Sequence, residues 1–314
     1  MRSSDRCLLA LALTLSGGAA HAADANGYAL ERFSPAPAGA GWLVLDDLSM
    51  HGGLGGALSV STGFARRPLH LGEGGGRLDV VSSQAFVGVG AALTWDRLRL
   101  TLDFSSPLRV RGQGGVVDGT AYRSPSVDPE SHPDSLADAR LGFDARLLGE
   151  AGGPFRLGLG AALLFPSGDR EDYQTDGTYR GVFKLLFASN LAPLLLAAHL
   201  GFHVRPLHAA PAYPRGNELL FGLAFGPRWP LRPDTSLVVG PELFGATAAQ
   251  GLLARETTAV EGLLTARLER GTDKGPLLRF KLGVGVGLHR EFGAPDWRTV
   301  LSIDLSDHTR GGAR

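Results

Sequence analysis

Alternating apolar and polar residues dominate the chain, and the segment 135–169 shows the alternation most clearly. From Ala137 to Leu147 every second residue is apolar, and the positions between them are charged or glycine. After a turn at residues 150–154, apolar residues recur at every second position from Phe155 to Phe165. A period of two is typical of extended strands with one apolar face and one polar or small face. The pattern therefore predicts a β-hairpin, either in a soluble sandwich or in a membrane barrel.

The same alternation recurs along the chain and predicts twelve strands. Their expected ranges are 53–65, 78–93, 97–106, 136–148, 155–165, 178–188, 194–204, 218–226, 235–246, 256–268, 277–288 and 297–306.

The connections between these strands differ in length, and the difference favours a barrel over a sandwich. Every second connection is short, whereas the intervening ones are mostly longer and polar, although the last two are shorter. Short turns at one end and long loops at the other are typical of outer-membrane barrels. Aromatic residues near strand ends, such as Trp95, Trp229 and Trp297, fit the interfacial girdles of such barrels. The sequence predicts an all-β antiparallel transmembrane β-barrel of about 12 strands, with short periplasmic turns and mostly longer extracellular loops.

The ends of the chain do not follow this pattern. Residues 1–22 have the positive start, apolar centre and Ala20-His21-Ala22 cleavage site of a signal peptide. Export by a cleaved signal peptide predicts localisation in the outer membrane of a Gram-negative bacterium. The barrel is expected over residues 51–307, followed by a short tail at 308–314.

Residues 23–50 contain prolines and only a short apolar run, Trp42-Leu43-Val44-Leu45. Two hypotheses are equally compatible with them: a periplasmic arm, or an arm inserted into the barrel with the apolar run as a possible plug.

Composition excludes several function classes. The chain has 31 basic and 31 acidic residues, so no net charge favours a nucleic-acid partner. The single cysteine, Cys7, lies in the predicted signal peptide, so disulfides and a thiol nucleophile are not expected. The expected partners are outer-membrane lipid and lipopolysaccharide, and no feature indicates an oligomeric state.

The polar faces of the predicted strands would line the lumen of the barrel. The expected lumen residues are Arg97, Arg99, Asp103, Asp138, Arg140, Asp144, Arg146, Arg156, Arg180, Lys184, His199, His203, Glu218, Glu242, Glu261, Arg267, Arg279, Lys281, Arg298 and Asp304. We expect charges such as Asp138 to pair, along or across the wall, with neighbours such as Arg140 or Arg146, because unpaired charges in a narrow tube are costly.

No motif indicates an enzyme, a cofactor or a metal. No local Ser–His or paired-Asp arrangement is present. His199 and His203 share a face but lie about 13 Å apart along a strand, too far for one metal ion. The acidic segment 169–177 lacks the ligand spacing of a calcium loop, so we interpret it as a solvated surface loop.

Two stretches carry a resemblance to a known family. The leader Leu30-Glu31-Arg32-Phe33 with Pro35 and Pro37, and the hairpin from Gly149 to Asp169, resemble the amino-terminal barrels of OmpA-family outer-membrane proteins. In that family, calcium-binding repeats and a peptidoglycan-binding domain follow the barrel. This chain ends at Arg314, so the resemblance implies the barrel alone and transfers no functional residue.

Two functions are therefore expected. The first is a narrow porin-like channel for small polar solutes with weak anion preference, because basic residues slightly outnumber acidic ones on the inward faces. The alternative is a non-conducting structural or surface-interaction barrel of the OmpA type.

Overall fold

A computed structural model of the protein describes most of the region that follows the predicted signal peptide. The described residues are 23–25, 27–30, 32–50, 52–72, 77–117, 119–130, 135–206, 216–271, 275–290 and 293–308. The predicted signal peptide with Cys7, and residues 309–314 of the predicted tail, lie outside them.

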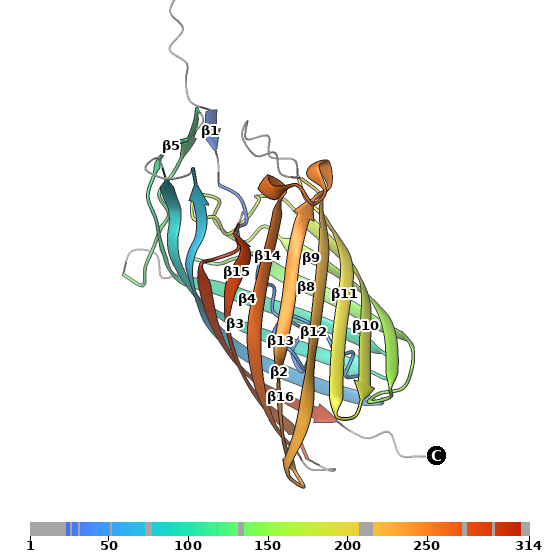
Figure 1. Ribbon diagram of the computed structural model, residues 1–314. Helices are drawn as coiled ribbons and strands as arrows, with labels where there is room; N and C mark the ends of the chain where they lie inside the picture. The colour runs from blue at the N-terminus through green and yellow to red at the C-terminus, as the bar shows by residue number, and fades with distance from the viewer. Residues whose placement is uncertain are drawn as a thin grey trace, which may run out of the picture.

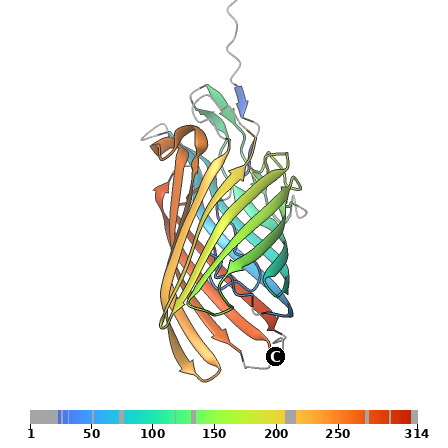
Figure 2. The same cartoon turned by 90° about the vertical axis from the view of Figure 1, so that its right-hand side faces the viewer.

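Twelve long strands form a closed antiparallel barrel (Figures 1 and 2). They are β2 (Leu54–Leu71), β3 (Leu78–Trp95), β4 (Leu98–Arg111), β8 (Ala139–Leu148), β9 (Phe155–Phe165), β10 (Arg180–Leu191), β11 (Leu194–Val204), β12 (Glu218–Arg232), β13 (Thr235–Ala248), β14 (Thr258–Arg270), β15 (Leu277–Arg290) and β16 (Trp297–His308). Neighbours in this order pair with each other, and β16 pairs with β2 to close the ring. Closure leaves no strand edge unpaired, which is what a strand assembly needs in lipid.

The twelve predicted strands are confirmed, with ends that differ by a few residues. The largest differences are at β2, β4 and β12, which continue for five or six residues beyond their predicted ends. Strand pairing explains the extension of β2 and β4, because Leu69 still pairs with Val81, and Arg111 with Ser83.

The outward faces form an apolar belt. Exposed leucine, valine and isoleucine side chains recur at every second position, as in Leu301, Ile303 and Leu305 of β16. The predicted girdle residues Trp95, Trp229 and Trp297 are also exposed. No helix in the described part of the chain is long and apolar enough to cross a membrane.

The loop between β4 and β8 has regular structure of its own. It contains β5 (Gly115–Val117), β6 (Thr120–Tyr122) and β7 (Ser126–Val127), and β7 pairs with the end of β4. β6 also pairs in parallel with β1 (Ala23–Ala25). Tyr122 and Val127 are buried in an apolar cluster with Tyr28 and Leu30. Apolar residues of this loop thus pack against the start of the chain.

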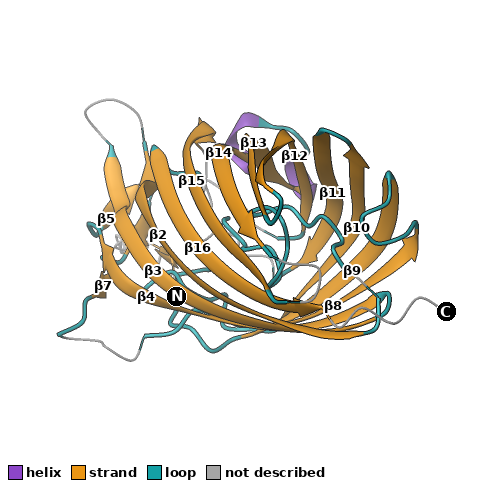
Figure 3. Ribbon diagram, turned by 90° about the horizontal axis from the view of Figure 1, so that it is seen from below, coloured by secondary structure: helices purple, strands orange, loops and turns teal. Residues whose placement is uncertain are grey.

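Residues 32–50, called the inner segment below, run through the barrel from the long-loop end to the short-turn end. At the long-loop end, Leu30 directly before it donates a backbone hydrogen bond to Tyr173 in the β9–β10 loop. At the short-turn end, Gly53 just after it bonds to Asp96 in the β3–β4 turn. Figure 3, a view from the short-turn end, shows this irregular chain inside the ring of strands.

The closed barrel predicts resistance to detergent. Without heating, the folded protein should stay compact in dodecyl sulfate and migrate differently on a gel from the boiled protein, because unfolding requires separation of a sheet without edges. Identical mobility before and after boiling, with solubility in the absence of detergent, would contradict the barrel.

The path of the inner segment predicts that the chain preceding Gly27 is at the cell surface, because long loops of such barrels face outward. An epitope placed directly before Ala23 should bind antibody on intact cells. The matched control is the same epitope in the β8–β9 turn at Glu150, which should bind antibody only after permeabilisation. The reverse labelling pattern would invert this topology.

Candidate functional site

The predicted lumen residues lie inside the barrel with one exception. The buried or partly buried ones are Arg99, Asp103, Asp138, Arg140, Asp144, Arg146, Arg156, Arg180, Lys184, His199, His203, Glu218, Glu242, Glu261, Arg267, Arg279, Lys281, Arg298 and Asp304. Arg97 instead lies in the β3–β4 turn, with a side chain that is 49% exposed and pairs with Glu150 at the rim. The turn places it at the end of the barrel, where the alternation of the strand no longer applies.

Most of the inward charges pair between strands, although Arg267 and Glu269 pair along β14 at 3.2 Å. Asp138 pairs with Arg180 of β10 at 2.7 Å, and not with Arg140 or Arg146. Arg140 pairs with Asp103 of β4 at 3.0 Å. Neighbours on one face of a strand are about 6.8 Å apart, whereas Cβ atoms opposite each other on adjacent strands are about 5 Å apart. An ion pair between adjacent strands therefore spans a shorter distance than one along a strand.

The carboxylate of Glu242 on β13 holds the middle of the inner segment. It accepts backbone N–H hydrogen bonds from Leu43 at 2.9 Å, Val44 at 2.8 Å and Leu45 at 3.2 Å. The hydroxyl of Thr265 on β14 donates a fourth bond at 2.6 Å. Glu242 is completely buried. Charge-assisted bonds of this kind are stronger than neutral ones, so this carboxylate is the main anchor of the apolar run 42–45.

Cations on β15 and β8 hold the other polar groups of the inner segment. The Lys281 ammonium donates to the carbonyl oxygens of Ala40 and Trp42, at 3.2 and 3.3 Å. Arg279 donates to the carbonyl of Gly39. Arg140 donates to the carbonyl of Pro35 at 2.8 Å. The segment has no regular secondary structure there, so the charged wall replaces the partners that a strand or helix would supply.

Two aspartates of the inner segment enter the charge network of the wall. Asp46 pairs with Arg99 of β4, which also pairs with Asp144 of β8 at 2.8 Å. The Asp47 carbonyl accepts a bond from Arg156 of β9 at 3.0 Å. These strands lie across the ring from Glu242 on β13, so the same short segment is contacted from opposite sides, which is possible only from inside the barrel.

Leucines of the inner segment fit against glycines of the wall. A Cβ at Gly283 would lie 2.4 Å from Leu43 Cδ1, one at Gly222 would lie 2.8 Å from Leu45, and one at Gly158 would lie 2.9 Å from Leu48. These glycines therefore leave the space that the leucines occupy. This observation favours close packing of the segment over curvature of the sheet as the reason for glycine at these positions.

Two aromatic side chains of the inner segment lie against buried arginines. The Trp42 ring lies 5.5 Å from the guanidinium carbon of Arg267, and the Phe33 ring 5.1 Å from that of Arg298. Cations at such distances over a ring face are attracted by its electrons. Trp42, Leu43, Val44 and Leu45, the possible plug, are all buried inside the barrel.

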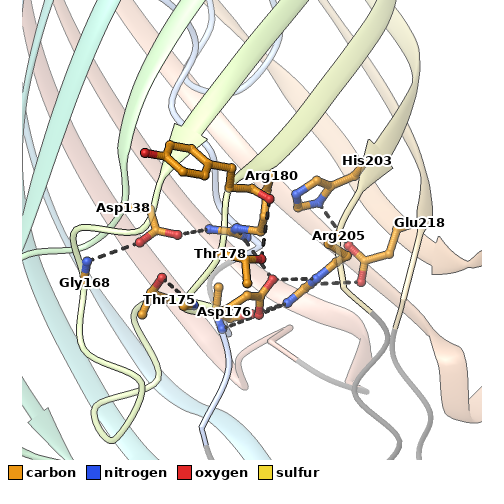
Figure 4. Close-up of polar contacts among 12 residues, drawn as sticks. Asp138, Gly168, Thr175, Asp176, Thr178, Arg180, His203, Arg205 and Glu218 are labelled. Atoms are coloured by element: carbon orange, nitrogen blue, oxygen red, sulfur yellow. Dashed lines mark hydrogen bonds and ion pairs between the residues drawn. The ribbon is translucent and has the colours of Figure 1, made fainter.

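A cluster of charges surrounds the entry of the inner segment at the long-loop end (Figure 4). Arg205 pairs with Asp176 at 2.7 Å and with Glu218 at 3.2 Å, and Glu218 also pairs with Arg32 at 2.6 Å. Asp176 additionally accepts a bond from the Ala29 N–H at 3.0 Å. Burial alone would lower the pKa of Arg205, but the carboxylates of Glu218 and Asp176 outweigh it and raise that pKa.

The same cluster corrects the interpretation of residues 169–177 as a solvated loop. Asp172, Tyr173, Gln174, Thr175 and Asp176 are all buried. Their contacts with Ala29 and Leu30 cover the outer end of the inner segment. Of the four carboxylates in residues 169–177, Asp172 and Asp176 are buried, whereas Asp169 and Glu171 are exposed. No local motif in the sequence indicates the contacts of Arg32, Asp46, Asp47 or Arg205.

A cavity of about 260 Å³ remains beside the inner segment. Its lining includes Phe33, Pro35 and Val44 from the segment, and residues of β2–β4 and β8–β13 from the wall. Among the described residues, no group of three histidine, cysteine or carboxylate side chains is arranged to hold a metal ion.

Comparison with known proteins gives matches of fold only. No family model matches the chain, and no curated protein matches it. The chain is similar to a solved outer membrane channel from Pseudomonas putida F1, with a TM-score of 0.51 and 16% identity, over 82% of this chain and 96% of that one. It is also similar to the NanC porin, with a TM-score of 0.48 and 8% identity, over 80% of this chain and 99% of that one.

The chain folds as an outer-membrane-type β-barrel. No family match confirms the resemblance to the OmpA family, so that resemblance stays a prediction.

The role of Glu242 as the anchor is testable by hydrogen exchange. In Glu242→Gln, an amide NH₂ group replaces one carboxylate oxygen and cannot accept hydrogen bonds from the N–H groups of the segment. Each buried group left without a partner costs about 1–3 kcal/mol. Amides 43–45 should then exchange about tenfold to a hundredfold faster in purified protein, while strand amides keep their rates. Glu150→Gln at the exposed turn is the control. Unchanged exchange at 43–45 would show that Glu242 does not hold the segment.

Proposed function

We propose that this protein is a narrow outer-membrane channel for small polar solutes, and that the inner segment closes it. The observation that carries the proposal is the path of residues 32–50, which fill the lumen from end to end. In eight-stranded barrels, side chains fill the interior, and twelve strands enclose a wider lumen. The segment therefore occupies space through which solutes would pass.

The contacts of the inner segment suit a part that moves. They are packing contacts, hydrogen bonds and ion pairs with wall side chains, and no strand of the barrel pairs with it through its backbone. The segment can therefore shift without opening the ring of strands. The cavity on one side of it supplies room for such a shift.

Charge balance supports weak anion preference once the segment moves. The inward-facing residues of the predicted set, together with the buried Glu269, comprise ten cationic side chains and eight carboxylates. The inner segment carries Asp46, Asp47 and Arg32, and its net negative charge offsets part of that excess while the segment is in place. Displacement of these aspartates leaves the wall with a positive excess, which favours anions in a narrow passage.

A reversible lock tests the gating role. Ala38 of the inner segment packs with Ala57 and Ala92 of the wall, and outside the predicted signal peptide the chain has no cysteine. The pair Ala38→Cys with Ala92→Cys should form a disulfide that fixes the segment. In a planar bilayer, the oxidised protein should pass no current, and reduction should restore small, salt-dependent currents. Anions should carry more of this current than cations of similar size.

The matched control joins two wall positions. Ala57 and Ala92 are register partners on β2 and β3, so Ala57→Cys with Ala92→Cys forms a disulfide that does not involve the segment. Oxidation should leave its currents unchanged. Equal currents in the locked and reduced 38/92 protein would contradict gating by the segment. Absence of current in every form, Glu242→Gln included, would leave the non-conducting structural barrel.

A further inference from the structure

The cavity beside the inner segment combines an apolar side with polar groups that lack partners. Phe33 of the segment, and Phe86 and Phe244 of the wall, form the apolar side, and their rings contact one another. Lys184 of β10 and His199 and His203 of β11 line the same cavity. A cavity of about 260 Å³ holds on the order of ten water molecules, or one compact organic solute.

The other charged groups of this cavity are already paired. Arg140 pairs with Asp103, Arg180 with Asp138, and Arg205 with Glu218. Both Asp46 and Asp144 pair with Arg99. Among the described residues, the Lys184 ammonium takes part in no hydrogen bond or ion pair, and neither does the His199 ring. Lys184 is thus the cation of this cavity whose three N–H donors stay available.

The position of Lys184 leaves space around its side chain. In the register of the sheet, Lys184 lies between Gly160 of β9 and Gly201 of β11, and neither neighbour has a side chain. His199 is diagonal to Lys184 on the same inward face, because its direct partner is Leu186. Diagonal neighbours on one face are about 7 Å apart, so one carboxylate can contact both side chains.

His203 supplies a second polar atom without a partner. Its Nδ1 lies 3.3 Å from the Glu218 carboxylate, while its Nε2 is buried and has no hydrogen-bond partner in the described structure. A buried polar atom without a partner is costly, and a bound solute or water would satisfy it. The unpaired atoms of Lys184, His199 and His203 all belong to one cavity wall.

We propose that this cavity is a binding site for a small organic monocarboxylate with a short apolar body. The carboxylate contacts Lys184 and His199, and the apolar body lies toward the phenylalanines. Mostly apolar pockets with a few well-placed polar groups are typical of small-molecule sites. The inference rests on the proposed channel function, because a lumen site meets only solutes that enter the lumen.

Fluorine NMR of the purified protein in detergent tests the site directly. The probe is 3,3,3-trifluoropropionate, and the matched neutral and cationic probes are 3,3,3-trifluoropropionamide and 3,3,3-trifluoropropylammonium. The carboxylate signal should broaden on addition of protein at low salt, and the other two should stay as sharp as with empty micelles. Added salt should weaken the effect because binding is between charges.

Two variants assign the effect to the cavity. Lys184→Met should weaken binding of trifluoropropionate about tenfold or more, because it removes the cationic donor. His199→Leu should weaken it less. Arg270→Gln removes the same charge from a side chain that is 71% exposed at the short-turn end, and should bind as the unchanged protein does. Each variant should retain the heat-dependent gel mobility of the folded barrel.

The outcomes separate this inference from the channel. Binding that Lys184→Met leaves unchanged, equal binding of the acid and its amide, or tighter binding of the ammonium would each overturn the site. The conductance of the reduced 38/92 protein tests the channel function independently. Currents without carboxylate binding would refute the site alone, and binding without currents would refute the channel alone.

Discussion

A charged side chain that faces the inside of a narrow barrel needs a partner, and this requirement governs the arrangement of the lumen. Removal of an ion from water without compensation costs several kcal/mol even after relaxation. The alternation of the strands places arginines, lysines and carboxylates on the inward face, where most of them are buried. Ion pairs between strands satisfy some of them, such as Arg298 with Glu261 at 3.0 Å. Others, such as Glu242 and Lys281, bind the inner segment.

The inner segment has the complementary requirement. Its irregular backbone lies at membrane depth, where N–H and C=O groups need partners as much as charges do. Glu242 accepts from its N–H groups and Lys281 donates to its carbonyls, so each side satisfies the other. A wall without the segment and a segment without the wall would each contain unsatisfied groups. The segment therefore occupies much of the lumen in this state, yet the bonds that hold it are separate from the bonds that close the ring.

The sequence predicts the barrel well because a period of two is a local property. Strand positions and inward faces follow from it, and it fails at Arg97, where the turn ends the alternation. Contacts between distant segments are not local. Ala29 and Asp176 are 147 positions apart, so no motif joined the acidic loop to the start of the chain. Asp138 pairs with Arg180 of β10, and β9 lies between β10 and β8, so no pattern within one strand indicates this partner. From the sequence, the apolar run 42–45 is compatible with a plug or with part of a periplasmic arm. Its contacts with Glu242 and Gly283 depend on the folded positions of distant strands.

Photo-crosslinking in intact cells tests most directly whether the charged wall holds residues 32–50 inside the barrel. A benzophenone side chain in place of Trp42 lies, in this account, beside Arg267 of β14. Illumination should give crosslinks within the same chain, which mass spectrometry should locate on β14 and neighbouring strands. The same side chain in place of the exposed Trp297 should give no crosslink to the inner segment. Crosslinks from position 42 to other proteins, with none to the inward faces of the strands, would contradict the account.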